Sequence, residues 1–414
     1  MIFRDRDKAT GDTTTIPGKI PIGIWALGFV SMLMDISSEM IHALLPLYMV
    51  SVLGTSTFAV GIIEGVAEAT AAATKVFSGA LSDWLGKRKL LAVLGYGLAA
   101  VTKPVFPLAT TFEWLVTARI VDRIGKGIRG APRDALVAEI APPELRGASF
   151  GLRQSLDTIG AFMGPLLAIG LMWLTANHFQ TVFWIAVIPA VAAVVVLIFL
   201  VREPRRSAGR KTVPMPLQVT ALRRLGGSYW WVIAIATVFT LARFSEAFLI
   251  LKAQAAGLPI AFAPLALVLM SLAYSLSAYP VGALSDRVDR IAILAAGLIL
   301  LLLADLTLAF SHGLTGAAIG VVLWGGHMGF TQGLLARLVA DTSPRELHGT
   351  AFGLFSLVTG LAMLIASILA GLLWETLGPA TTFLAGACFA ALSLLGLVVF
   401  RRPLSSPELT ITKE

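Results

Sequence analysis

The sequence predicts an all-α membrane protein whose twelve transmembrane helices form two pseudo-symmetric six-helix bundles. The first observation behind this prediction is composition: of the 414 residues, 57% are hydrophobic and 14% are charged, whereas a soluble domain has roughly 45–50% and about 25%. The hydrophobic fraction is close to what twelve helices of about 20 residues would use. The other two observations are a regular series of apolar segments and an internal repeat. Together they exclude a soluble protein.

Apolar segments separated by short polar breaks follow one another as six, a pause and six more. They cover 22–50, 58–81, 90–109, 114–138, 148–174, 180–201, 229–251, 261–283, 291–311, 315–339, 349–373 and 379–400. Each is long enough to cross a bilayer. The pause is rich in arginine and proline, which is the composition of a solvated linker. We therefore expect an N-terminal bundle over 1–201, a cytoplasmic linker over 202–228 and a C-terminal bundle over 229–414.

Basic residues are confined to alternate breaks. The first, third and fifth breaks carry no Lys or Arg, whereas the even breaks carry Lys87, Arg88, Lys89, Arg146, the linker cluster, Arg287, Arg290 and Arg345. Cytoplasmic loops carry such an excess of positive charge. The sequence therefore predicts that both termini face the cytoplasm from the cell (inner) membrane. The first apolar segment is too long for a signal peptide, so we expect it to be retained as a helix.

The two halves of the chain repeat each other. The five residues 79–83 recur letter for letter at 282–286, and several residues of 142–152 recur in 344–354 at an offset of 202. Two matches at nearly one spacing indicate internal duplication. Two such halves related by an axis along the membrane normal are a transporter architecture, in which the substrate site lies near the midplane between the halves.

Three motifs give the chain its resemblance to a known family. They are Gly79-x-Leu81-Ser82-Asp83-x-x-Gly86-Lys87-Arg88-Lys89, Arg123-x-x-Lys126-Gly127 and Gly160-x-x-x-Gly164-Pro165. In these motifs the chain resembles the major facilitator superfamily, most closely its drug/proton antiporter branch. The resemblance implies antiport and efflux of a small organic molecule. Lys126 and Arg129 make the fourth helix more cationic than the family pattern.

The first motif has a physical interpretation of its own as a gate. Asp83 can accept charge-assisted hydrogen bonds from a neighbouring helix and so hold one conformation closed. The alternative is an ordinary basic loop with a helix-capping aspartate. The repeat carries Gly282 and Asp286 at the corresponding positions, with Asp289 in place of Gly86.

The third motif lies on the fifth helix. Gly160 and Gly164 are one turn apart and permit close helix packing, and Pro165 removes a backbone donor. Packing alone is the simpler interpretation, because this spacing of glycines is common in membrane helices.

Ionisable residues inside the predicted spans are the candidates for proton coupling or substrate binding, because charges in hydrocarbon are costly and normally functional or paired. The first half contributes Asp35, Glu39, His42, Glu64, Glu68, Arg119, Asp122, Arg123, Lys126, Arg153 and Asp157, and the second half contributes Arg243, Glu246 and His327. A charge network that only locks the first bundle is the alternative.

Glu39 and Glu246 are the leading pair. Asp35, Glu39 and His42 share one helix face. Each glutamate lies 17 residues from the start of its segment, or about 25 Å at 1.5 Å per residue, so the two should face each other at equal depth. Desolvated carboxyl groups of this kind suit proton coupling. The alternative for Glu246 is neutralisation by Arg243.

Other features are weaker or exclude function classes. His327 has a cavity-lining interpretation and a core interpretation, and Asp305, near the outer end of the ninth segment, suggests an interfacial carboxylate. The single cysteine, Cys388, excludes intramolecular disulfides and cysteine-rich zinc sites. The sequence lacks HExxH and GxxxxGK[ST] motifs, so we expect no enzyme, no nucleotide-driven pump, no metal and no cofactor.

The prediction that follows is a secondary active transporter that exports a small organic molecule by exchange with protons. The alternative is a proton-coupled uptake carrier for an organic anion or chelate. The expected partners are the small-molecule cargo, protons and the lipid bilayer, with no nucleic acid, and the chain is expected to act as a monomer.

Overall fold

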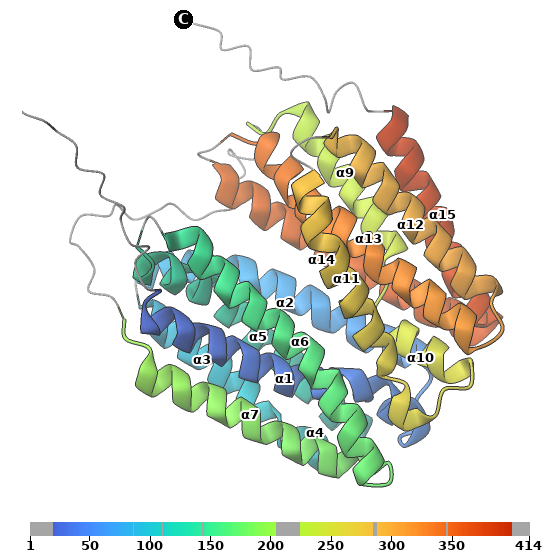
Figure 1. Cartoon of the computed structure of the whole chain (residues 1–414), viewed down its shortest axis with the longest axis horizontal. Coiled ribbons are helices and arrows are strands. Elements are labelled where there is room, and N and C mark those ends of the chain that lie inside the picture. Colours follow the sequence, from blue (N-terminus) through green and yellow to red (C-terminus); the bar gives the residue numbers. More distant parts are fainter. Residues whose placement is uncertain are drawn as a thin grey trace, which may run out of the picture.

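The computed structural model describes residues 20–85, 87–109, 111–142, 145–203, 224–284, 288–344 and 347–399, whose regular elements are helices (Figure 1). The first half contains α1 (Ile22–Ser51), α2 (Thr57–Leu85), α3 (Arg88–Thr102), α4 (Val105–Leu108), α5 (Phe112–Ile140), α6 (Arg146–Leu174) and α7 (Phe179–Leu200). The second half contains α9 (Gly227–Ala242), α10 (Ala247–Ala255), η2 (Ile260–Phe262), α11 (Leu265–Leu284), α12 (Arg290–Phe310), α13 (Leu314–Asp341), α14 (His348–Leu377) and α15 (Pro379–Val399). Each of the twelve apolar segments thus lies on one helix or on consecutive helices. Most of the expected linker, 204–223, lies outside the described residues.

Two of the expected continuous helices are interrupted. The third segment breaks between α3 and α4 at Pro104, where the missing backbone N–H ends the hydrogen-bond ladder. The seventh breaks over 243–246, so that Glu246 occupies the position before α10 without a capping hydrogen bond from its side chain. This second break corrects the expectation of one straight helix, and neither Pro nor Gly causes it.

Nine of the spans in the described part of the chain are long and apolar enough to cross a membrane. The other three segments lie on α2, α5 and α13, which are similarly long at 29, 29 and 28 residues. Of these, α5 carries a row of cations and carboxylates in its interior turns. These charged residues lie on a helix that packs against α2 and α3 within the first bundle.

The helices form two bundles, α1–α7 and α9–α15, that meet along two seams (Figure 1). We call the end where α1 and α9 begin the linker end, and the opposite end the far end. The longer seam joins α2 to α14, and the other joins α6 to α11. At the far end α1 also contacts α10, and α6 contacts η2.

Glycines allow the α2–α14 seam to be close. A Cβ at Gly65 would lie 2.9 Å from the carbonyl oxygen of Leu364, and a Cβ at Gly61 would collide with that of Ser367. The backbones therefore touch directly, as small residues permit in membrane helices. At the far end of the seam, the backbone N–H and hydroxyl of Thr57 both donate to Oε2 of Glu375, at 2.9 and 2.8 Å.

The internal duplication is visible in a repeated ion pair at the linker end. Arg88 Nη1 lies 2.7 Å from Glu139 Oε1, joining α3 to α5. Arg290 pairs with Asp341 between α12 and α13, and both residues are offset by 202 positions from the first pair. Corresponding helices are thus joined by a corresponding ion pair in each bundle.

The expected gate can be placed only in part. Gly79 lies on α2, Lys87 precedes α3 and is exposed, Arg88 forms the ion pair above, and Gly282 lies on α11. The side chain of Asp83, together with Gly86 and Asp286, lies outside the described residues. The gating role stays a prediction from the sequence.

Candidate functional site

The first bundle contains a buried charged triad that joins α1, α2 and α5. Arg119 Nη2 donates to Glu64 Oε2 at 2.7 Å and approaches His42 Nδ1 at 2.7 Å. Arg119 and Glu64 are each 1% exposed. Because a guanidinium has no acceptor, Nδ1 of His42 must accept, which makes the imidazole neutral with its proton on Nε2. These three predicted candidates thus form hydrogen bonds and an ion pair with one another.

A second buried pair was missed by sequence reasoning. Lys103, at the end of α3, places Nζ 2.8 Å from Asp122 Oδ1 and 3.0 Å from the Ser38 hydroxyl. Asp122 was among the candidates, but Lys103 was not. The one sequence signal for Lys103 is a lysine beside a proline in an otherwise apolar segment.

Toward the linker end, α5 and α6 share a four-membered network. Arg153 Nη1 lies 2.7 Å from Asp157 Oδ2, one turn along α6, and 3.5 Å from Asp134 Oδ1. Arg133 contacts the same two carboxylates at 3.6 and 3.2 Å. The expected Arg153–Asp157 pair therefore exists, but α5 supplies half of its neutralisation.

Two further buried cations of α5 pair with carboxylates that are partly exposed. Arg123 Nη1 lies 3.2 Å from Glu68 Oε1, and Arg129 Nη2 lies 3.8 Å from Asp35 Oδ1. Arg129 also stands over the Tyr96 ring, 4.9 Å from its centroid. The carboxylates of both pairs are partly exposed, so these contacts are easier to exchange than the buried ones.

Glu39 on α1, Lys126 on α5 and Glu246 at the break before α10 are among the candidates whose side chains make no hydrogen bond or ion pair within the described residues. Lys126 is exposed, and both glutamates are partly buried. The positive charge of Lys126 interacts electrostatically with both carboxyl groups, and the charge of Glu39 interacts electrostatically with Glu246. The three groups are therefore near one another, with one glutamate from each bundle.

The glycine motif of α6 lies directly behind this part of α1. A Cβ at Gly160 would lie 3.0 Å from that of Asp35, and a Cβ at Gly164 would lie 2.6 Å from that of Glu39. Pro165 follows without interrupting α6. The motif thus brings α6 against the helix face that carries the two acidic candidates.

Arg243 does not pair with Glu246 in the described structure, contrary to the alternative considered from sequence. Its guanidinium carbon lies 5.7 Å from the ring centroids of both Phe239 and Trp324. The break over 243–246 separates the two residues, so the one-turn spacing of a continuous helix does not apply. Glu246 therefore has no ion pair among the described residues, although the positive charge of Arg243 still acts on it.

Two residues of the second bundle differ from their expected surroundings. His327 is fully buried and so does not line an open cavity, and neither ring nitrogen meets the geometry of a full hydrogen bond, although the backbone of Trp324 lies close to the ring. Asp305 is 0% exposed rather than interfacial. The reason is that Asp305 lies on the face of α12 that packs against α13 and α15. Its position near the end of the helix does not indicate this face.

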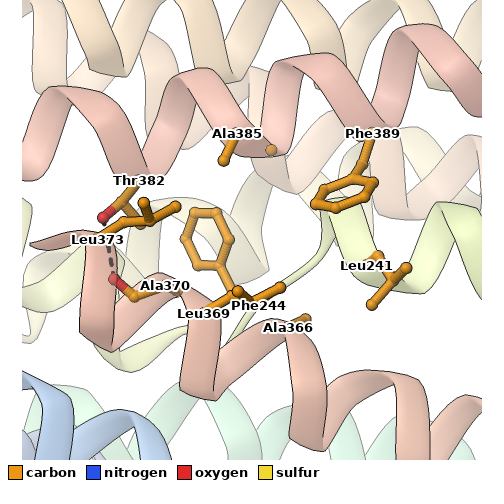
Figure 2. A pocket seen from close by; sticks show the side chains of 10 residues that line it. Leu241, Phe244, Ala366, Leu369, Ala370, Leu373, Thr382, Ala385 and Phe389 are labelled. Atoms are coloured by element: carbon orange, nitrogen blue, oxygen red, sulfur yellow. Dashed lines mark hydrogen bonds between the residues drawn. The ribbon is translucent and has the colours of Figure 1, made fainter.

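An apolar pocket of about 230 Å³ lies between α9, α14 and α15 (Figure 2). The rings of Phe244 and Phe389 and small residues such as Gly386 line it, and the Thr382 hydroxyl is bonded to the Ala370 carbonyl at 3.0 Å. With its one hydroxyl already engaged, the pocket offers little to a charged cargo. It adjoins the break at 243–246 through Phe244.

No cluster of three or more His, Cys, Asp or Glu side chains suited to a metal ion occurs in the part of the chain that the structure describes. The site therefore consists of charged and apolar side chains of the two bundles.

Comparison with known proteins identifies the architecture. The model of the Major Facilitator Superfamily matches residues 27–265 and 244–414. A relative from Methanocaldococcus jannaschii, the MFS-type transporter MJ1317, is 32% identical over 381 residues, which cover 91% of this chain and 94% of the relative. Multidrug resistance protein MdtH of Photorhabdus laumondii is 29% identical over 39% of this chain and 40% of its own length.

Solved structures share the fold at low sequence identity. A bacterial homologue of the human lysosomal transporter Spinster, in an inward-facing and unoccupied conformation, superposes with a TM-score of 0.73 at 18% identity, covering 94% of this chain and 100% of its own. The nucleoside transporter NupG superposes with a TM-score of 0.72 at 14% identity, covering 93% of this chain and 99% of its own.

Proposed function

The chain belongs to the major facilitator superfamily, and on that basis we propose that this transporter exports a small organic molecule in exchange for protons. It is an integral membrane transporter rather than an enzyme. We place both termini and the linker in the cytoplasm, which makes the far end the outer side of the cell (inner) membrane, and we propose that one chain is the working unit. The partial similarity to the multidrug resistance protein MdtH favours export.

The observation that carries the proposal is the pair of free carboxyl groups, Glu39 and Glu246. Most other carboxylates of the first bundle's interior are held by a cation at 2.7–3.8 Å. A carboxyl group without a fixed partner can exchange between a proton and a group of the cargo, which is the requirement for coupling. In a transporter that works by alternating access, a carboxyl group between the bundles is exposed first to one side of the membrane and then to the other.

The α2–α14 seam supports the conformational part of the proposal. Backbones that touch through Gly61 and Gly65 can rock over each other with little side-chain rearrangement. The Thr57–Glu375 contact then holds the far end in the conformation described here. Release of this contact would accompany opening toward the far side.

The test is Glu39→Gln, which mimics a permanently protonated carboxyl group. In inside-out vesicles with a respiration-generated pH gradient, compounds that collapse the gradient through the wild-type protein should fail to do so through this variant. Cargo binding or cargo–cargo exchange should remain, because only deprotonation is lost. Glu246→Gln should also impair coupling, since Arg243 does not hold that carboxylate.

Glu113→Gln is the matched control, because Glu113 lies exposed in the first turn of α5 and should leave transport unchanged. Full proton-coupled transport by a correctly inserted Glu39→Gln protein would exclude Glu39 and move the search to Asp35 and Glu68. Loss of cargo exchange together with coupling would assign Glu39 to cargo binding instead.

One observation favours the second candidate, uptake of an organic anion or chelate. Lys126 is exposed and has no ion pair among the described residues, so its ammonium group is free to bind an anion. Lys126→Gln separates the two functions. It should abolish uptake of an anionic cargo, whereas export of a neutral or cationic cargo should persist.

A further inference from the structure

The second bundle contains a buried acid that the coupling scheme above does not use. Asp305 on α12 is 0% exposed, and neither carboxyl oxygen has a partner among the described residues. The indole N–H of Trp324 lies close to the carboxyl group, but the two do not meet the geometry of a full hydrogen bond. His327, whose ring centroid lies 4.8 Å from that of Trp324, also has both ring nitrogens unpartnered.

The internal duplication shows what the first bundle places at the same positions. At the offset of 202, Asp305 corresponds to Lys103 and Trp324 to Asp122. Lys103 and Asp122 form the buried ion pair at 2.8 Å. The second bundle thus has a carboxyl group where the first has an ammonium group, and an indole where the first has the balancing carboxylate.

A carboxylate without a cation or hydrogen-bond donors is strongly disfavoured in a membrane interior, whereas the neutral acid is tolerated. We propose that Asp305, which lies beside Trp324, is a further proton-binding site, located in the second bundle and separate from Glu39 and Glu246. In the first bundle Lys103 neutralises the carboxylate of Asp122. In the second bundle a proton bound to the Asp305 carboxyl group removes the negative charge instead. Release of the proton leaves a carboxylate that needs a new partner.

The elements around Asp305 indicate how a cation could approach its carboxylate. On α15, a Cβ at Gly386 would lie 2.6 Å from Asp305 Oδ2 and 3.2 Å from the ring of Phe244, so the acid and the break over 243–246 meet at this glycine. The titratable or charged groups that face the cluster are His327 from α13 and Arg243 from the break, whose guanidinium lies over Trp324. Movement of the break therefore changes the distance between Asp305 and Arg243. The site gains or loses its proton as the second bundle changes shape.

The experiment is infrared difference spectroscopy of the purified full-length protein in lipid nanodiscs, recorded between acidic and alkaline buffer without any cargo. The wild type should show the carbonyl stretch of a buried protonated carboxyl group, and Asp305→Asn should lack this band. Glu39→Gln should retain it, so the outcome is independent of the proposed coupling through Glu39. Identical spectra of wild type and Asp305→Asn would overturn the proposal.

Two further variants keep the test decisive if Asp305→Asn does not fold. Asp305→Glu keeps an acid at the position and should shift the band, and Trp324→Phe should shift it because the nearby indole N–H is removed. A band that stays unchanged in both variants would belong to another carboxyl group and would equally overturn the proposal.

Discussion

The buried triad of the first bundle allows a prediction whose size follows from burial. Replacing Glu64 by leucine leaves Arg119, which is 1% exposed, with His42 as its remaining side-chain partner among the described residues. Breaking one side of a buried ion pair typically costs about 3–5 kcal/mol, because a charge is left without compensation. We expect about 3 kcal/mol for Glu64→Leu, since the hydrogen bond to His42 persists. Reversible unfolding in mixed detergent micelles, followed by circular dichroism, measures this difference.

The matched control is the exposed pair at the linker end. Arg290 and Asp341 are 37% and 47% exposed, and an exposed pair contributes about 0–1 kcal/mol. Asp341→Asn should therefore change the unfolding free energy little. The double variant Glu64→Leu/Arg119→Leu should recover most of the loss, leaving about 1 kcal/mol for the unpaired His42 nitrogen. A cost of Glu64→Leu no larger than that of Asp341→Asn would refute the reasoning.

Two further predictions concern the seam between the bundles, with a Ser56→Cys reporter at the far end labelled from outside sealed cells. Gly61→Ala should separate α2 from α14 and raise the labelling rate, whereas Gly170→Ala, whose Cβ would enter open space, should not; equal rates would contradict the tight seam. Glu375→Gln should also raise the rate, because a neutral amide accepts more weakly from Thr57 than a carboxylate does. An unchanged rate would mean that the contact does not hold the far end closed, and no labelling from outside in any variant would contradict the proposed orientation.

The helical architecture could be predicted because it depends on quantities that a sequence displays directly. The length of an apolar run decides whether a helix can span the bilayer, and a repeat decides the symmetry of the halves. The break over 243–246 could not be predicted, because no Pro or Gly marks it. It arises where α9 and α10 pack against different neighbours, and such tertiary effects override local propensity.

Individual pairs of the candidate site were predictable only where both partners lie on one helix. Arg153 and Asp157 are one turn apart, so their pairing follows from helix geometry. Lys103 and Asp122 lie on different helices, and nothing in their spacing of 19 residues indicates that they meet. Asp305 shows the same limit, because the sequence gives its depth along α12 but not the face that α13 and α15 cover.

The two bundles differ in how they treat interior charge, and this difference assigns them different parts in transport. Arg119 in the first bundle corresponds, at the offset of 202, to Val321 in the second, and the first bundle's charges are tied across α1, α2 and α5. A satisfied polar network rigidifies the helices that it joins, so the first bundle should move as one body. The second bundle instead has the break over 243–246, where few backbone hydrogen bonds oppose a change of shape. Glu246 therefore lies in the part of the molecule that can most readily alter its surroundings, and the charge of Glu39, in the first bundle, acts on it.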